Sequence, residues 1–379
     1  MRILHLYKDY YPVLGGIENH IRSLAEAQVA RGHEVSVLTT NLGARSDVAR
    51  IGGVKRIRAG RIATIASTPI SPAMVARLRR IETDIVHLHF PYPAGEITNL
   101  LVGRARRTII TYHSDIVRQR RILQIYTPLL RHVLRTADRI IATSAPYLRS
   151  SPFLRAVQDR CAVVPLGIDL ARFAEPSRDA AAVRAAAGVP AATPLVLFVG
   201  VLRYYKGLDT LISAMALIPD AHLVIVGDGP MRNAITSMAA QMGLTSRVTL
   251  TGQVDDATLS AWYSAGDLFV LPSNVRAEAF GTAILEAMAA GLAVVSTEVG
   301  SGTSWVNQHG VTGTVVAPQA PRELADAIRE LIENPARRRA MGDHGRTRVR
   351  DEFSIETMVA GVEAVYRQAL DAPPVSRRA

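Results

Sequence analysis

Residues 2–40 read RILHLYKDYYPVLGGIENHIRSLAEAQVARGHEVSVLTT. The stretch begins with a short apolar strand, and a loop ending in Gly15-Gly16 follows it. Apolar residues at three- and four-residue spacing then predict a helix over residues 17–31, which a glycine ends before a second strand at 34–40. A strand, a glycine loop, a helix and a strand in this order predict a βαβ unit of the doubly wound type.

The same alternation continues through the first half of the chain. Further short apolar strands are predicted at residues 85–89, 108–112, 139–143 and 162–165. Apolar strands that alternate with helical segments predict an α/β domain, with a mainly parallel sheet covered on both faces.

A second series of the same kind follows residue 194. It has predicted strands at residues 195–201, 222–226, 248–251, 268–271 and 293–297, with helices at 208–218, 231–242, 257–265 and 282–290. The repeated order predicts two Rossmann-like, doubly wound domains that face each other across a cleft.

We expect four segments along the chain. They are a first domain at 1–170, a linker at 171–194, a second domain at 195–352, and a C-terminal helix and tail at 353–379. Two long amphipathic helices are predicted at 321–341 and 354–370, and such a helix can cross back to brace the first domain.

Composition limits the class of protein. Hydrophobic residues make up 48% of the 379 residues and charged residues 20%, which excludes a disordered chain. The single cysteine, Cys161, excludes an internal disulfide and a cysteine-based zinc site, and we expect it to be a buried structural thiol. Without a transmembrane-length apolar run or a signal-peptide layout, we expect a soluble, cytoplasmic protein.

The net charge of +11 is confined to the first half. Residues 1–170 hold 25 Lys and Arg against 12 Asp and Glu, whereas residues 171–379 hold 19 against 21. A basic domain suits nucleic acid, an anionic membrane or a phosphorylated substrate, and scattered surface arginines are the alternative. Aromatic residues total only 5% and no basic helix is interleaved with them, which argues against nucleic acid.

Three turns between a strand and a helix suit an anionic ligand. They are Gly15-Gly16, Arg203–Gly207 and Phe280–Thr282. Helix N-termini supply free N–H groups there, and glycine lets a backbone approach a phosphate closely; ordinary turn chemistry is the alternative for each. The G-x-G-x-x-G fingerprint is absent from the first turn and a Walker A motif from the whole chain, which disfavours a dehydrogenase and a P-loop NTPase.

Two carboxylates and one histidine accompany these turns. Glu278 precedes the predicted helix at 282–290, and Glu286 lies within it among apolar residues, where it can accept hydrogen bonds from a ribose or sugar diol. A salt-bridged acid on the helix face is the alternative. His113 follows the strand at 108–112, where it can donate to a sugar hydroxyl or serve as a structural histidine. A phosphate turn between two carboxylates suggests a nucleotide sugar.

Together these segments resemble glycosyltransferase family 4, whose members are retaining nucleotide-sugar transferases of the two-Rossmann GT-B fold. The resemblance covers nearly the whole chain and rests on Gly15–Glu18, His113, Arg203–Gly207, Gly227–Pro230 and the E-x7-E segment from Glu278 to Glu286. It implies that the first domain binds the acceptor and the second domain the nucleotide sugar.

The resemblance also implies roles for single residues. Glu278 would contact hydroxyls of the transferred sugar and Glu286 the ribose, while Lys206 and Arg203 would neutralise the departing diphosphate. His113 would line the reaction centre. The implied donor-binding set is completed by Gly15, Gly16, Gly229, Gln253, Val254, Phe280, Gly281 and Thr282. One departure is Val201, which stands where many members have an arginine.

The expected reaction is transfer of a hexose from a nucleotide diphosphate sugar, with retention, to a sugar or lipid-linked acceptor in cell-surface polysaccharide or glycolipid synthesis. The residues at 299–311 and the first turn resemble bacterial mannosyltransferase-like members, so GDP-mannose is the first donor considered. A UDP-hexose donor and a GT-B nucleotide-sugar epimerase are the alternatives. No cofactor is expected, and no metal, because the chain has no Asp-x-Asp pair and cations replace it.

The basic first domain also suggests contact with the inner face of the cell membrane. Residues 116–135 predict an amphipathic helix with one apolar stripe. Its remaining faces carry Arg118, Arg120, Arg121, Arg131 and Arg135. We expect either an ordinary surface helix or a surface that holds the enzyme on anionic lipid beside its acceptor.

Overall fold

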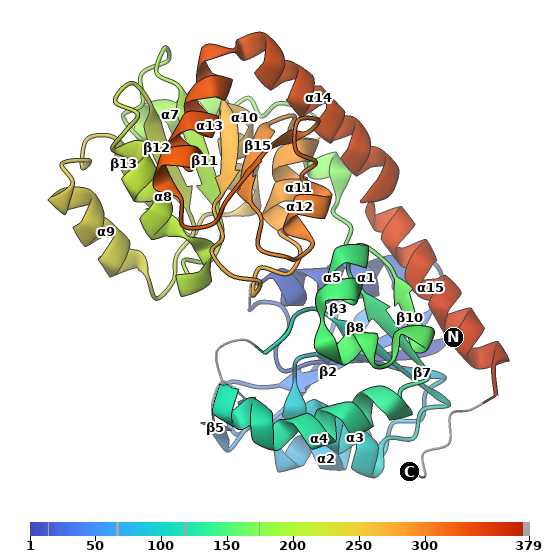
Figure 1. The fold of residues 1–379 in the computed structure, drawn as a ribbon. Coiled ribbons are helices and arrows are strands. Elements are labelled where there is room, and N and C mark those ends of the chain that lie inside the picture. The colour runs from blue at the N-terminus through green and yellow to red at the C-terminus, as the bar shows by residue number, and fades with distance from the viewer. Residues whose placement is uncertain (14, 66–67, 117–119, 174, 374–379) are drawn as a thin grey trace. The chain divides into compact units, whose positions relative to one another are not determined.

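The computed structural model describes all residues except 14, 66–67, 117–119, 174 and 374–379. The chain divides into two compact units (Figure 1). Unit 1 comprises residues 1–167 together with the segment that begins at Ile355, and unit 2 comprises residues 168–354. Each unit is a parallel sheet covered by helices, so the α/β prediction with two Rossmann-like domains is confirmed.

The main sheet of unit 1 has the strand order β10-β9-β8-β7-β1-β2-β4-β3, and only β3 is antiparallel to its neighbour. Its strands are β1 (Arg2–Leu6), β2 (Glu34–Thr40), β3 (Asp47–Ile51), β4 (Val54–Ala59), β7 (Ile85–Phe90), β8 (Arg107–Tyr112), β9 (Arg139–Ala142) and β10 (Cys161–Val163). A separate hairpin is formed by β5 (Ala63–Ile65) and β6 (Thr68–Ile70). The order reverses between β1 and β7, and ligands of such sheets bind at the carboxyl edge of that point.

Helices cover this sheet. They are α1 (Gly16–Ala30), α2 (Pro72–Leu78), α3 (Pro93–Val102), α4 (Arg120–Thr136), α5 (Ala145–Ser150), α6 (Pro152–Arg155) and α15 (Ile355–Asp371), with a 3-10 turn at Gln158–Arg160. The C-terminal helix α15 packs against α1, β8 and β9, which confirms that it returns to the first domain (Figure 1). The side chains that it buries include Met358, Val362 and Tyr366.

The sheet of unit 2 is entirely parallel, with the order β13-β12-β11-β14-β15-β16. Its strands are β11 (Leu195–Val199), β12 (His222–Val226), β13 (Val248–Gly252), β14 (Leu268–Leu271), β15 (Ala293–Thr297) and β16 (Gly313–Val316). The order reverses between β11 and β14. Both strands are buried throughout, which leaves their carboxyl ends as the place for polar chemistry.

The helices of unit 2 include some that the sequence did not predict. They are α7 (Ala180–Ala186), α8 (Leu208–Met215), α9 (Arg232–Gln241), α10 (Asp256–Ala265), α11 (Thr282–Ala289), α12 (Thr303–Val306), α13 (Pro321–Glu333) and α14 (Pro335–Glu352), with 3-10 turns at Leu170–Phe173 and Tyr204–Lys206. The expected linker contains α7, which packs on α10 inside unit 2.

The helix predicted over residues 321–341 is two helices. Pro335 has no N–H to continue α13, and the Asn334 side chain accepts a hydrogen bond of 3.0 Å from the Arg337 N–H to begin α14. None of the helices built from described residues is long and apolar enough to cross a membrane.

Candidate functional site

The loops that follow β11 and β14 in unit 2 are joined at the carboxyl edge of the sheet. Gly207 lies in the left-handed region (φ +67°), and a Cβ atom there would collide with the carbonyl oxygen of Pro272. The Asn274 N–H donates a hydrogen bond of 2.9 Å to the carbonyl oxygen of Tyr205. These contacts hold the turn that carries Lys206 against the loop that leads to Glu278.

A buried ion pair occupies this junction. The Lys206 Nζ atom lies 2.5 Å from Oε2 of Glu278, and the two residues are 9% and 8% exposed. Burial alone would lower the pKa of Lys206, but the attraction of Glu278 outweighs it and the pKa lies above its ordinary value. The Ser273 hydroxyl also donates to Glu278, over 3.4 Å. The sheet therefore presents a fixed cation beside a carboxylate where its order reverses.

Helix α11 begins next to this pair. Gly281 precedes it with φ +81°, and no side chain caps its first turn, so the N–H groups at the positive end of the helix are available to an anion. Thr282 is the first helical residue. The ring of Phe280 is buried against Trp305 and Phe353. Phe280 thus anchors the turn through its side chain, and only its backbone remains for a ligand.

Glu286 projects from α11 as the second carboxylate. The hydroxyl of Tyr263, on α10, donates a hydrogen bond of 2.7 Å to Glu286 Oε2. Burial raises the pKa of Glu286 above its usual range, and this hydrogen bond opposes the shift. Glu286 thus makes a hydrogen bond with a tyrosine, whereas the alternative interpretation, an acid on the helix face, required a salt bridge. Its carboxylate retains acceptor capacity for further hydroxyl groups.

The other residues predicted in unit 2 occupy the same edge of the sheet. Gly229 packs on the backbone of Leu202, where a Cβ atom would lie 2.7 Å from both N and O of that residue. Arg203 is exposed and makes no ion pair with any residue that the structure describes. Gln253 and Val254 follow β13, two strands from β11 in the sheet order.

Three predicted residues belong to unit 1. Gly15 and Gly16 begin α1, which follows β1 at the point where the order of that sheet reverses. Gly15 is extended (φ −179°), a conformation open to any residue, and a Cβ atom there would contact the Glu18 carboxylate. His113 follows β8, and its backbone N–H donates a hydrogen bond of 3.2 Å to the carbonyl oxygen of Phe90.

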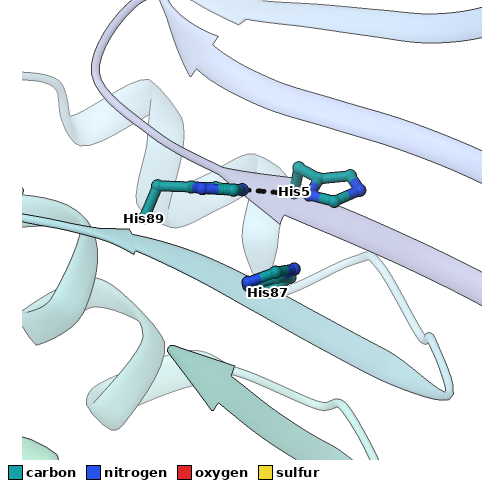
Figure 2. A group of neighbouring side chains, drawn as sticks. All are labelled: His5, His87 and His89. Carbon is teal, nitrogen blue, oxygen red and sulfur yellow. Dashed lines mark hydrogen bonds between the residues drawn. The ribbon is translucent and has the colours of Figure 1, made fainter. Parts of the chain in front are cut away.

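His113 lies in a group of histidines that sequence reasoning missed. The histidine cluster consists of His5 on β1, His20 on α1, His87 and His89 on β7, and His113; each is at most 6% exposed. Figure 2 shows His5 beside His87 and His89, which come from the neighbouring strand.

The sequence did contain a signal for this cluster. His87 and His89 are two residues apart on a predicted strand and therefore share one face of the sheet. Burial lowers the pKa of all five cluster histidines, to about 4 for His5 and about 3 for His20. The rings are consequently neutral near pH 7.

Known proteins show the same two-part construction. Residues 14–172 match the family model for Glycosyltransferase Family 4, and residues 179–348 match the model for Glycosyl transferases group 1. The chain is 36% identical to the D-rhamnosyltransferase WbpZ of Pseudomonas aeruginosa over 364 residues, which cover 93% of this chain and 92% of that one. The chain belongs to glycosyltransferase family 4.

Two further similarities support the fold and the enzyme class of this family 4 glycosyltransferase. It is 34% identical to the O-antigen chain mannosyltransferase C of Escherichia coli, over 98% of this chain and 99% of that one. The structure of a sucrose-phosphate synthase from Thermosynechococcus elongatus matches with a TM-score of 0.82 at 28% identity, over 98% of this chain and all of that one. The protein is a GT-B glycosyltransferase that acts on nucleotide sugars.

Proposed function

We propose that this glycosyltransferase moves a manno-configured hexose, with mannose from GDP-mannose as the first choice, to a sugar or lipid-linked acceptor with retention at the anomeric carbon. The observation that carries the proposal is the buried Lys206–Glu278 pair beside the N-terminus of α11. The cation and the helix N–H groups can bind a diphosphate, and the carboxylate can accept hydrogen bonds from the hydroxyl groups of a sugar. Glu286 supplies an acceptor for the ribose diol.

The hard step is departure of the nucleoside diphosphate from the anomeric carbon. Lys206 and the first N–H groups of α11 stabilise the negative charge that grows on the leaving oxygen. The acceptor hydroxyl attacks from the face that the diphosphate leaves, and the leaving phosphate oxygen takes its proton. Glu278 is a poor candidate for a covalent nucleophile, because Lys206 and Ser273 already hold its carboxylate. We propose that these fixed donors serve the reaction without a divalent metal or a cofactor.

The choice of sugar draws on the relatives. The two relatives described above are a D-rhamnosyltransferase and an O-antigen chain mannosyltransferase. D-Rhamnose is 6-deoxy-D-mannose, so both sugars share the manno arrangement of ring hydroxyls. This agreement favours a manno-configured donor over the UDP-hexose alternative.

Stabilisation by nucleotides tests the donor. GDP is expected to raise the melting temperature where UDP does not, by an amount equivalent to about 2.7 kcal/mol at 100 times the Kd. Glu286→Ala is expected to weaken GDP-mannose binding by about 1–3 kcal/mol, because a buried acceptor of the ribose diol is lost. Differential scanning fluorimetry and calorimetric titration measure both effects.

Tyr263→Phe is the matched control, because it removes the hydroxyl that Glu286 accepts from but keeps the carboxylate. Stabilisation by UDP alone would establish the UDP-hexose alternative, and no response to any nucleotide would refute the proposed donor site. Incubation of the nucleotide sugar without an acceptor separates a transferase from an epimerase, because only the epimerase would yield a new nucleotide sugar.

We also propose that unit 1 contacts an anionic membrane beside a lipid-linked acceptor. Helices α3 and α4 pack on each other and expose large apolar side chains, with Leu101 76% and Ile125 84% exposed. Arg131 and Arg135 are exposed on α4. Arg118 lies outside the described residues, as do the side chains of Arg120 and Arg121. Each cation near an anionic bilayer contributes about 1 kcal/mol.

Sedimentation with liposomes of rising anionic lipid content tests this contact. The unmodified protein is expected to bind in a salt-sensitive manner, and changing Arg118, Arg120 and Arg121 together to Gln is expected to abolish binding. The matched control changes Arg322, Arg337 and Arg339 of unit 2 to Gln, which removes the same charge elsewhere. An unmodified protein that stays in the supernatant at low salt would favour a soluble acceptor.

A further inference from the structure

Three histidines of the cluster form a continuous hydrogen-bonded chain. Gln28 Oε1, on α1, lies 2.8 Å from Nε2 of His5. Nδ1 of His5 lies 3.0 Å from Nε2 of His89. Nδ1 of His89 lies 3.1 Å from Nε2 of His113. This histidine chain thus runs from the buried side-chain amide of Gln28, on α1, to His113 at the carboxyl end of β8.

The rings in this chain meet edge to edge through their nitrogens. The facing nitrogens of His89 and His113 are much closer (3.1 Å) than the ring centroids (5.4 Å), and the interplanar angle is 21°. His5 and His89 have the same relation, with centroids 5.3 Å apart and an interplanar angle of 30°; Figure 2 shows His89 edge-on with its contact to His5. This geometry suits a linear N–H···N hydrogen bond.

The direction of every bond in the chain follows from its first member. A carbonyl oxygen only accepts, so Gln28 Oε1 requires a hydrogen on Nε2 of His5. A neutral imidazole carries one hydrogen, so His5 Nδ1 accepts from Nε2–H of His89, and His89 Nδ1 accepts from Nε2–H of His113. Because burial keeps these rings neutral, His113 is left with a lone pair on Nδ1.

The other neighbour of the Gln28 amide supports its orientation. Gln28 Nε2 lies 3.4 Å from the hydroxyl of Tyr366 on α15, and that hydroxyl lies 2.6 Å from Nδ1 of His87. A reversed amide would require an O–H···O bond of 3.4 Å, well beyond the usual 2.5–3.0 Å, whereas an N–H donor tolerates this separation better. With the amide as placed, Tyr366 donates to His87, and His87 Nε2–H donates to Thr111 Oγ1 over 2.6 Å.

We infer that Gln28, His5 and His89 are positioning residues, which hold His113 as the Nε2–H tautomer and thereby offer its Nδ1 as an acceptor to a substrate hydroxyl. None of the described residues makes a hydrogen bond to Nδ1 of His113. The sequence suggested a donor at this position, and the chain of imidazoles reverses that role. The identity of the substrate hydroxyl rests on the proposed function, whereas the tautomer does not.

Metal ligation is the competing explanation. The ligand atoms of His5, His87 and His89 lie within 4.8 Å of one another, and so do those of His20, His89 and His113. Both ring nitrogens of His5, His87 and His89 already make hydrogen bonds within this network. A metal ion would have to break several of these bonds, so the hydrogen-bonded chain accounts for the arrangement more simply.

Nitrogen-15 NMR of histidine-labelled protein, without substrate, reads the tautomer directly. At pH 7, His113 is expected to be the Nε2–H tautomer, with its signals assigned by their loss in His113→Gln. Gln28→Glu retains an acceptor facing His5 and is expected to keep this tautomer, whereas Gln28→Leu is expected to yield a mixture of tautomers. A His113 ring protonated on Nδ1, or one equivalent of zinc in the purified protein, would overturn the inference.

Kinetics shows whether the tautomer matters to transfer. Gln28→Leu is expected to lower kcat about 10–100-fold, by analogy with the loss of partners that orient metal-ligating histidines. Thr111→Val is the matched control: it breaks the branch through His87 but leaves the path to His113 intact, so kcat is expected to stay unchanged. Thermal melts confirm that the variants fold.

The two proposals fail in distinguishable ways. The expected tautomer in a protein that transfers no sugar would refute the proposed function and leave the histidine chain standing. An active transferase whose His113 is the Nδ1–H tautomer would refute the inferred role of the histidine chain and leave the proposed function standing. Equal losses of kcat in Gln28→Leu and Thr111→Val would also refute it, because that result reports general destabilisation of the cluster.

Discussion

Lys206→Ala is expected to lower kcat by about 10²–10³-fold and to change KM much less. The Lys206 ammonium is paired with Glu278 before the reaction and gains most when negative charge develops on the departing diphosphate. Steady-state kinetics with a saturating acceptor measures the split between kcat and KM. Turnover near that of the unmodified enzyme would show that Lys206 does not serve the leaving group.

This substitution also has a structural cost that must be separated from the chemical one. Without Lys206, Glu278 is a buried carboxylate without its cation, and loss of one partner of such a pair costs about 3–5 kcal/mol. Thermal melts therefore accompany the assay. Arg203→Ala is the comparison, since Arg203 is exposed and its removal strands no buried charge. A comparable loss of kcat in Arg203→Ala would assign Arg203 the role of the arginine that Val201 replaces. A mild loss of kcat in Arg203→Ala, exceeded by a gain of kcat in Val201→Arg, would mean that the enzyme works with one cation fewer at the diphosphate.

Acidification from pH 7.5 to 5.5 is expected to destabilise unit 1 by about 5 kcal/mol, while unit 2 changes little. The five cluster histidines have pKa values below their ordinary value of 6.5 in the folded state. In this interval the histidines of the unfolded chain become protonated, whereas those of the folded protein stay neutral. The free energy of unfolding therefore decreases as the pH falls. Because the unfolded pKa of 6.5 lies in the middle of this interval, each histidine contributes about 1.4 kcal/mol over the whole change from pH 7.5 to 5.5, and all five contribute about 7 kcal/mol.

Glu96 opposes this loss. Burial raises the pKa of Glu96 to about 7, so the folded protein takes up a proton there before the unfolded chain does, and that adds back about 2 kcal/mol by pH 5.5. In unit 2 the lowered pKa of His222 and the raised pKa of Glu286 act in opposite directions. The net loss is comparable to the whole stability of many domains, and it falls on unit 1.

The two tryptophans allow the units to be followed separately. Trp262 and Trp305 both lie in unit 2, so their fluorescence reports that unit, while far-ultraviolet circular dichroism reports both. Urea titrations at a series of pH values are expected to give coincident transitions at pH 7.5 and separate ones near pH 5.5. His20→Leu should reduce the proton uptake by one, since both ring nitrogens of His20 are buried without a hydrogen-bond partner among the described residues. Coincident transitions at every pH would contradict the expectation.

The sequence predicted the repeated α/β pattern because buried parallel strands are nearly continuous apolar runs. Strands β2, β12, β14 and β15 lie where the periodicity placed them. Strands β3 and β4 escaped prediction, because the segments DVARI and VKRIRA alternate with arginine and lysine. In this sheet β3 is an edge strand, so polar side chains there meet water.

The candidate site was only partly readable from the sequence. Lys206, Glu278, Gly281 and Glu286 come together because loops that follow neighbouring parallel strands share one edge of the sheet. The hydrogen-bond partners of these residues could not be predicted from the sequence, since the hydroxyl of Tyr263 contacts Glu286 from another helix. The histidine chain depends likewise on Gln28 and Tyr366, which are separated by 338 residues.

That separation determines the order in which a growing chain can assemble the protein. Unit 2 has all its residues once Ser354 has been made, whereas unit 1 still lacks α15. Until Ile355–Asp371 leaves the ribosome, Gln28 has no Tyr366 hydroxyl, and Arg31 and His33 have no Glu363 carboxylate. The half of the enzyme that is translated first is therefore the half that is finished last.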